Sequence, residues 1–136
     1  MIVCDAVNIA KTNCYEINVS RPENCVELTF KGYWDESEEM KYYLDDIKAA
    51  VDMLKTGFIF IIDMSDFIGC ISKYLTTTIE AQKYLVSKEL KVTAEILPTN
   101  PIFRPICEML SKESGMKTLY FTNRCYAQGW FLLNKN

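Results

Sequence analysis

Five consecutive apolar residues, Phe58 to Ile62, constrain the fold of this chain more than any other feature. In a strand, successive side chains point to opposite faces, so a run that is apolar at every position has to be buried on both sides. Asp63 follows the run, and we expect the strand to end there. The sequence therefore predicts a central strand with a layer of structure on each face, as in α/β proteins.

The residues before this strand have the spacing of an amphipathic helix. Apolar positions recur at intervals of 4, 3, 4 and 3, which places them on one helix face. They are Met40, Leu44, Ile47, Val51 and Leu54. Asp35 and Glu38 have the spacing of a capping box, and Gly57 suits the left-handed position after a helix. We expect this helix to cover residues 36–56.

An antiparallel hairpin is predicted near the start of the chain. Apolar and polar residues alternate over residues 15–19 and again over 26–30, around a turn that contains Pro22 and Asn24. One face of this hairpin is apolar, and the other carries polar side chains that we expect to meet water. The polar residues are Glu16, Asn18, Glu27 and Thr29.

The rest of the chain alternates helices and strands. Further helices are expected from Ser72, between Phe103 and Gly115, and around Trp130, and further strands at residues 92–96 and 119–121. The order β-β-α-β-α-β-α-β-α implies a single α/β domain over residues 1–136, with a mixed sheet that is antiparallel at its start. Residues 1–13 should add an extra strand or cover the open face of the central strand, and a homodimer is an additional way to cover it.

Composition removes several functional classes. The chain has no histidine, which excludes Ser-His-Asp and Cys-His catalysis and His-ligated zinc. Its net charge is −3, which argues against nucleic acid as a partner. The six cysteines form no CxxC pair and are expected to be reduced and mostly buried. No basic leader and no membrane span are recognisable, so we expect a cytoplasmic protein.

Four fragments carry a family resemblance. They are Phe30–Trp34 before an acidic helix start, Gly57–Ser65, Lys91–Leu97 before a proline-bounded loop, and Phe121–Thr122 followed by Ala127 and Trp130–Phe131. In these fragments the chain resembles the STAS domain, the fold of the SpoIIAA anti-anti-sigma factors, and in particular the branch that is grouped with CRAL-TRIO lipid-transfer domains. The resemblance implies a SpoIIAA-like βα superhelix. It also implies a non-enzymatic regulatory module with a protein partner, or alternatively a module that binds an apolar small molecule or lipid.

Ser72 departs from the pattern of the phosphorylatable STAS switches. In those proteins an Asp-Ser-Ser-Gly-like turn starts the helix after the central strand. Here that place is taken by Ile71–Tyr74, and only Ser72 matches. We interpret Ser72 as the N-cap of the next helix, where serine is a preferred residue, with a switch serine as the alternative.

The candidate site lies in the loops that follow the carboxyl ends of the parallel strands, where α/β folds usually bind ligands. Asp63, Ser65 and Asp66 are positioned there to hydrogen-bond a ligand or a divalent ion, together with loops 98–100 and 122–124. We favour a structural role for these short polar residues. No phosphate-binding glycine loop, nucleophile elbow, catalytic set, metal site or cofactor site is recognisable.

Overall fold

A six-stranded sheet is formed by the described part of the chain, residues 2–35 and 40–135, in a computed structural model. The strands follow one another in chain order across the sheet. They are β1 (Val7–Lys11), β2 (Tyr15–Ser20), β3 (Cys25–Trp34), β4 (Ile59–Cys70), β5 (Val92–Ile96) and β6 (Thr118–Phe121). β1, β2 and β3 are antiparallel neighbours, and β3 to β6 are parallel. The predicted hairpin and mixed sheet are therefore confirmed, and β1 is the extra N-terminal strand.

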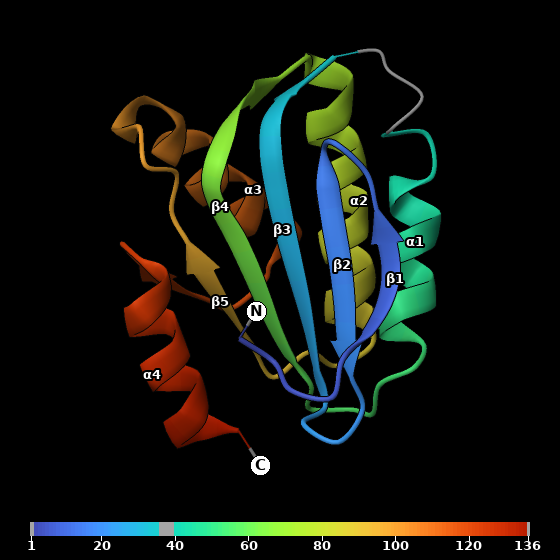
Figure 1. Cartoon of the computed structure of the whole chain (residues 1–136). Coiled ribbons are helices and arrows are strands. Elements are labelled where there is room, and N and C mark those ends of the chain that lie inside the picture. The colour runs from blue at the N-terminus through green and yellow to red at the C-terminus, as the bar shows by residue number, and fades with distance from the viewer. Residues whose placement is uncertain (1, 36–39, 136) are drawn as a thin grey trace.

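Helices cover both faces of this sheet (Figure 1). They are α1 (Tyr43–Val51), α2 (Ser72–Ser87), α3 (Arg104–Ser114) with the short 3-10 helix η2 (Pro101–Phe103) before it, and α4 (Arg124–Asn134). Figure 1 shows α1, α2 and α3 behind the sheet and α4 in front of it. α3 ends where predicted, with Gly115 in the left-handed conformation (φ 77°).

The central strand divides the core into two clusters, as its apolar run predicted. Phe60 and Ile62 pack with the layer of α1, α2 and α3. Ile59 and Ile61 pack on the other face, with Phe131 of α4. Ile2 and Val3 complete that second cluster, so the N-terminal segment covers part of the face that α4 leaves open. The two layers together bury β4 on both sides.

The predicted end of the central strand at Asp63 is wrong. β4 continues to Cys70 and keeps pairing with β3, after shifts of register between Thr29 and Lys31 and between Gly32 and Trp34. Met64 and Phe67 remain buried along this extension and hold it against the helix layer. Asp63 can be buried inside the strand because its carboxylate pairs with the guanidinium group of Arg124, far away in the sequence.

The predicted boundaries of the helix before the central strand also need correction. Within the described part of the range 36–56, the α-helix covers Tyr43–Val51, with no side-chain bond at its N-cap, Tyr42. Glu38 of the expected capping box lies outside the described residues. Gly57 does adopt a left-handed conformation (φ 83°), but its N–H donates to the Glu89 carbonyl, well past the helix.

Ser72 is not the N-cap of α2. Ile71 occupies the cap position, Ser72 is the first helical residue, and no side chain forms a hydrogen bond at the cap. The hairpin prediction is corrected at two positions as well, because Asn18 is buried instead of facing water, and so is Glu27. Its carboxylate lies under the N-terminal segment, a contact between residues far apart in the sequence.

Candidate functional site

Arg124 is the centre of a charged cluster on the face of the sheet that α4 covers. Its Nη1 lies 2.6 Å from Oδ2 of Asp63, and its Nη2 lies 2.7 Å from Oε2 of Glu27. Both carboxylates are buried, whereas the arginine side chain is partly exposed. Because β5 ends beside Asp63 and β6 ends beside β5, the helix that follows β6 begins next to Asp63. The sheet topology thus brings the arginine to the carboxylates.

The remaining oxygens of both carboxylates also have partners inside the protein. Oδ1 of Asp63 accepts hydrogen bonds from the backbone N–H and the hydroxyl of Ser65, at 2.9 and 2.6 Å. Oε1 of Glu27 accepts from the backbone N–H groups of Ile2 and Val3, at 2.8 and 3.1 Å. Every carboxylate oxygen in the cluster is therefore used to hold the fold together, which favours a structural role over acid–base chemistry.

The structure brings some of the predicted site residues together and separates others. Asp63 and Ser65 join Arg124, and the N–H of Thr99 donates to the Ser65 carbonyl, so the loops after β5 and β6 meet there as expected. Asp66 is exposed further along β4. Ser72 lies beyond the end of β4 at the start of α2, in the opposite layer. The described residues contain no group of three or more metal-ligating side chains arranged around one point.

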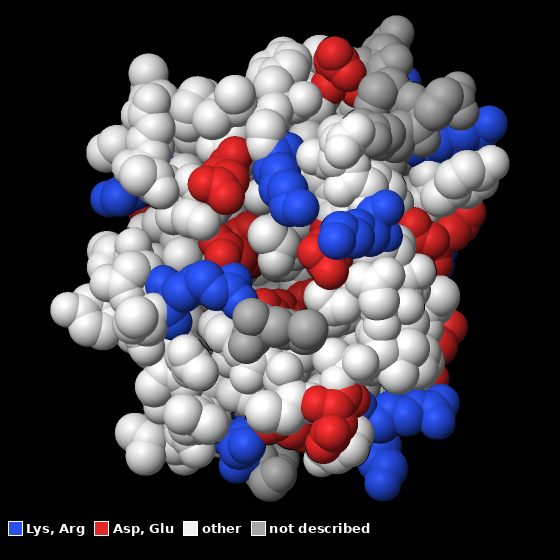
Figure 2. Space-filling view, viewed as in Figure 1, with Lys and Arg blue, Asp and Glu red and all other residues white. Residues whose placement is uncertain are grey.

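The surface around this cluster carries charges of both signs. Figure 2 shows acidic and basic side chains standing next to each other across the face that bears α4. Such a mixed surface differs from the basic stripe of a nucleic-acid-binding face.

Among the described residues, no helix is long and apolar enough to cross a membrane.

Glu95 is a buried ionisable residue that sequence reasoning did not single out. It lies on β5, only 1% exposed, and faces α3. Burial raises the pKa of its carboxyl to about 8; a hydrogen bond with Cys107 acts in the opposite direction, and nearby Glu108 raises it further. Its Oε2 has no hydrogen-bond partner among the described residues. One sequence signal could have indicated this burial. The apolar face of α3 packs on the sheet, so the side chains that β5 directs toward α3, including Glu95, are buried.

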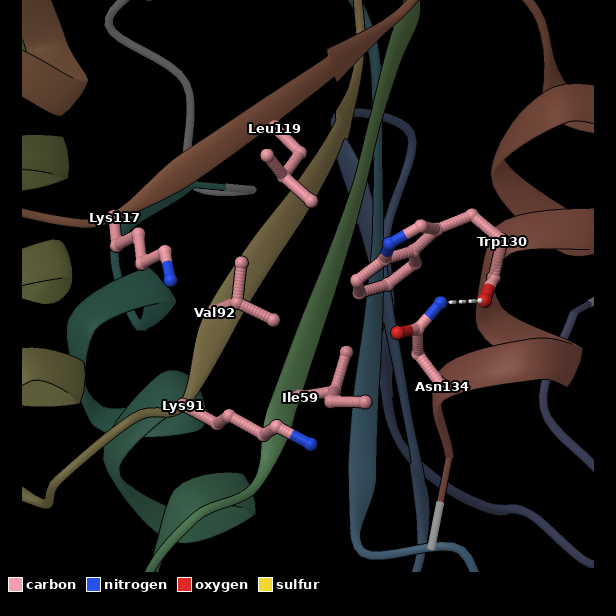
Figure 3. A pocket seen from close by; sticks show the side chains of 7 residues that line it. All are labelled: Ile59, Lys91, Val92, Lys117, Leu119, Trp130 and Asn134. Atoms are coloured by element: carbon pink, nitrogen blue, oxygen red, sulfur yellow. Dashed lines mark hydrogen bonds between the residues drawn. The ribbon is translucent and has the colours of Figure 1, made fainter.

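A pocket of about 190 Å³ lies between α4 and the amino-terminal ends of three strands (Figure 3). Its lining consists of Ile59, Lys91, Val92, Lys117, Leu119, Trp130 and Asn134. The sequence prediction considered the carboxyl ends of the strands and missed this opposite end. The pocket depends on how α4 crosses the sheet, which no local pattern reveals.

The outer face of α4 exposes large apolar side chains. Tyr126, Leu132 and Leu133 are 66%, 55% and 88% exposed, and we call these three residues the α4 patch. No charged residue occurs between Arg124 and Lys135. The helix therefore has apolar side chains on its solvent side as well as on its buried side.

Comparisons with known proteins identify the fold. No protein-family model matches the chain, and no curated protein is similar to it. Its structure is similar to that of an uncharacterised protein of the DUF3478 family from Shewanella loihica PV-4, which has a SpoIIAA-like fold. The TM-score is 0.66 at 14% sequence identity, and the similarity covers 90% of this chain and 97% of that one. The resemblance seen in the sequence is thereby confirmed at the level of the fold, and the chain is a SpoIIAA-like protein in its architecture.

Proposed function

We propose that this chain is a non-enzymatic module that binds another protein through the outer face of α4. The α4 patch carries this proposal. A surface helix normally presents charged and polar residues to water, and contiguous exposed apolar side chains mark interaction sites. Tyrosine is also among the residues enriched in protein interfaces. A partner that covers Leu132 and Leu133 would remove from water the apolar surface that α4 exposes.

The attachment of α4 supports the same proposal, because an interface needs a rigid base. Arg124 ties the start of the helix to Glu27 and Asp63. At the other end, Lys135 Nζ lies 2.6 Å from Oε2 of Glu23. Gly129 adds an open position on the helix, since an added Cβ atom there would meet no atom of a neighbouring element within 4 Å. A partner backbone can therefore approach α4 closely.

Site-specific photocrosslinking in the source cells tests the proposal. A photoreactive phenylalanine analogue at position 126 should give one discrete cross-linked species. The same analogue at Lys112, an exposed residue of α3, should not. Leu133→Glu in the first variant should abolish the species, because it places a charge in the interface. The mass identifies the partner, and a species of twice 15.7 kDa would be a homodimer. Indistinguishable patterns at positions 126 and 112 would refute the proposal.

The cysteines support a cytoplasmic location as part of this proposal. No disulfide joins any two of the six, and Cys4 and Cys125 are exposed. Exposed thiols persist in a reducing compartment. We expect all six to react with a thiol reagent after denaturation without reductant, and a smaller number would indicate a disulfide. In the native protein Cys4 and Cys125 should react first, because burial raises the pKa of Cys70 to about 11 and that of the Cys107 thiol further.

Binding of a small molecule is the second candidate function, and the pocket beside Trp130 favours it. The pocket is concave and combines four apolar side chains with three polar ones, and ligand sites likewise combine apolar walls with a small number of polar groups. Native mass spectrometry of freshly purified protein would reveal a bound apolar molecule as additional mass. A clean mass would leave protein binding as the better-supported function.

A further inference from the structure

We infer that the pocket between α4 and the starts of β4, β5 and β6 binds a small carboxylate with an apolar body. This inference rests on the second candidate function, ligand binding, and is independent of the α4 patch. Ile59 and Val92 present aliphatic side chains from the sheet, and Trp130 faces them from α4 (Figure 3). The indole also packs against Phe121, with ring centroids 5.9 Å apart. Both walls are thus held in place by neighbouring elements.

Two lysines give the pocket a positive edge. Lys91 comes directly before β5 and Lys117 directly before β6, and both line the pocket. The strands pair in parallel, and the N–H of Thr93 donates to the Lys117 carbonyl at 2.8 Å, so the two strand starts lie side by side. Within the described residues, neither ammonium group forms an ion pair. Figure 3 shows the two ammonium groups on different sides of Val92, so an anion in the pocket would be attracted by both charges but would pair directly with only one of them.

Asn134 adds a polar group on the α4 side. Its Nδ2 donates to the Trp130 carbonyl at 2.8 Å, which fixes the orientation of the amide. Figure 3 shows the nitrogen turned toward Trp130 and the amide oxygen on the side of Ile59, where that oxygen can accept a hydrogen bond. The charge that selects a carboxylate therefore comes from the lysine ammonium groups at the edge of the pocket.

The size and polarity of the pocket restrict the rest of the ligand. Pockets for drug-sized molecules are usually larger, about 300–1,000 Å³, so this one suits a compact molecule and not a whole lipid. Its apolar walls disfavour a strongly hydrated polyanion, because desolvating such an ion has a high free-energy cost. A short aliphatic or aromatic carboxylate combines an apolar body with a single charge.

Titration with hexanoate, followed through the indole N–H resonances, tests the inference. Trp130 should show a saturable shift with a dissociation constant on the order of 1 mM, as expected for so few ligand atoms. Trp34 is an internal control, because its indole is buried elsewhere and donates to the Lys31 carbonyl. Hexanol has the tail without the charge, and acetate has the charge without the tail. Each should bind at least about tenfold more weakly than hexanoate.

Variants separate the site from its surroundings. The double change Lys91→Gln and Lys117→Gln should weaken hexanoate binding about fivefold, as loss of one exposed ion pair and of a second, more distant attraction would. Lys112→Gln should leave it unchanged. Leu133→Glu should also leave it unchanged, so failure of the protein-binding proposal remains distinguishable. The inference is overturned if Trp130 shows no saturable shift up to roughly 50 mM hexanoate. It is also overturned if hexanol or acetate binds as well, or if the double variant binds like the original chain.

Discussion

Glu95 shows how one buried side chain makes stability depend on pH. The pKa of its carboxyl is about 8 in the folded protein, mainly through burial, against an ordinary value of 4.5. Between these two values the folded chain holds a proton that the unfolded chain has lost. The free energy of unfolding therefore falls as pH rises through this range, by at most about 1.4 kcal/mol per pH unit. At pH values below the ordinary pKa of 4.5, the carboxyl is protonated in both the folded and the unfolded chain, and the contribution of Glu95 to the free energy of unfolding is fully present.

We predict that Glu95→Gln flattens this pH dependence. Glutamine has nearly the same shape and cannot ionise, so the variant should gain stability relative to the original chain as pH rises toward about 8. Urea unfolding between about pH 5 and about pH 8 measures the effect. Glu113→Gln, at an exposed position of α3, is the matched control and should keep the original slope. Equal slopes in the original chain and in Glu95→Gln would assign the pH dependence to other groups.

Arg124 pairs with two buried carboxylates, so we predict a clear cost for Arg124→Gln. Breaking a buried ion pair costs roughly 3–5 kcal/mol, and partial exposure of the arginine reduces this to about 2 kcal/mol. Adding Glu27→Gln and Asp63→Asn to the variant should restore part of the loss, because the unpaired charges are then gone. Lys88→Gln is the control, since its 3.9 Å pair with Asp52 is exposed and should contribute less than about 1 kcal/mol. Equal midpoints for the arginine and lysine variants in chemical denaturation would contradict this assignment.

At the scale of helices and strands, two helix starts make contrasting predictions. Asn123 caps α4, with its side chain accepting a hydrogen bond from the N–H of Tyr126 at 3.0 Å. We expect Asn123→Ala to cost about 1 kcal/mol. Ser72 forms no such bond at the start of α2, so Ser72→Ala should change stability by less than about 0.5 kcal/mol. Thermal and urea unfolding of both variants provide the comparison. A larger loss for Ser72→Ala would restore the capping interpretation.

The interpretation of Ser72 as a switch serine predicts a change in partner binding instead of a change in stability. It requires that Ser72→Ala or a phosphomimetic Ser72→Glu alters cross-linking at the α4 patch while leaving stability unchanged. Ser72 is exposed, so neither substitution disturbs the core. Unaltered cross-linking in both variants would leave Ser72 without a switch role at this surface.

Local patterns predicted the elements of this fold better than their ends. The runs that identified β2, β3 and β5, and the glycine that ends α3, act within a few residues of the chain, so the sequence carries them directly. Asp63 illustrates the other case. It reads as a strand end because a lone carboxylate is costly to bury, yet its partner Arg124 lies 61 residues away. The same reason explains two other errors. Glu27 was predicted to face water, and the pocket beside Trp130 was not predicted, because both depend on segments that are distant in the sequence and pack on the same face of the sheet.

At the scale of the whole molecule, two glutamates join the N-terminal segment to α4. Glu27 accepts from the backbone of Ile2 and Val3 with one oxygen and binds Arg124 with the other. Glu23 repeats this arrangement, with one oxygen on the N–H of Cys4 and the other on Lys135. The first and last segments of the described chain are therefore held by the same carboxylates. Together they form the layer that covers this face of the central strand.

Deletion of residues 1–10 should therefore expose apolar surface. It removes Ile2 and Val3 from the cluster that contains Ile59, Ile61 and Phe131, and it removes most of β1 from the edge of the sheet. It also takes two hydrogen-bond donors from buried Glu27. We expect aggregation or strong binding of an apolar dye, measured by size-exclusion chromatography and dye fluorescence.

A double variant, Ile2→Ser with Val3→Ser, tests the same account without disturbing β1. It keeps the backbone donors to Glu27 and removes only the apolar cover, so dye binding should rise while the sheet edge stays intact. If dye binding rises in the deletion alone, the loss of β1 would be the cause and the covering role of Ile2 and Val3 would be wrong. A truncated chain that stays monomeric, soluble and equally stable would remove the structural role of the whole segment. In that case α4 alone would be sufficient to protect the central strand from water.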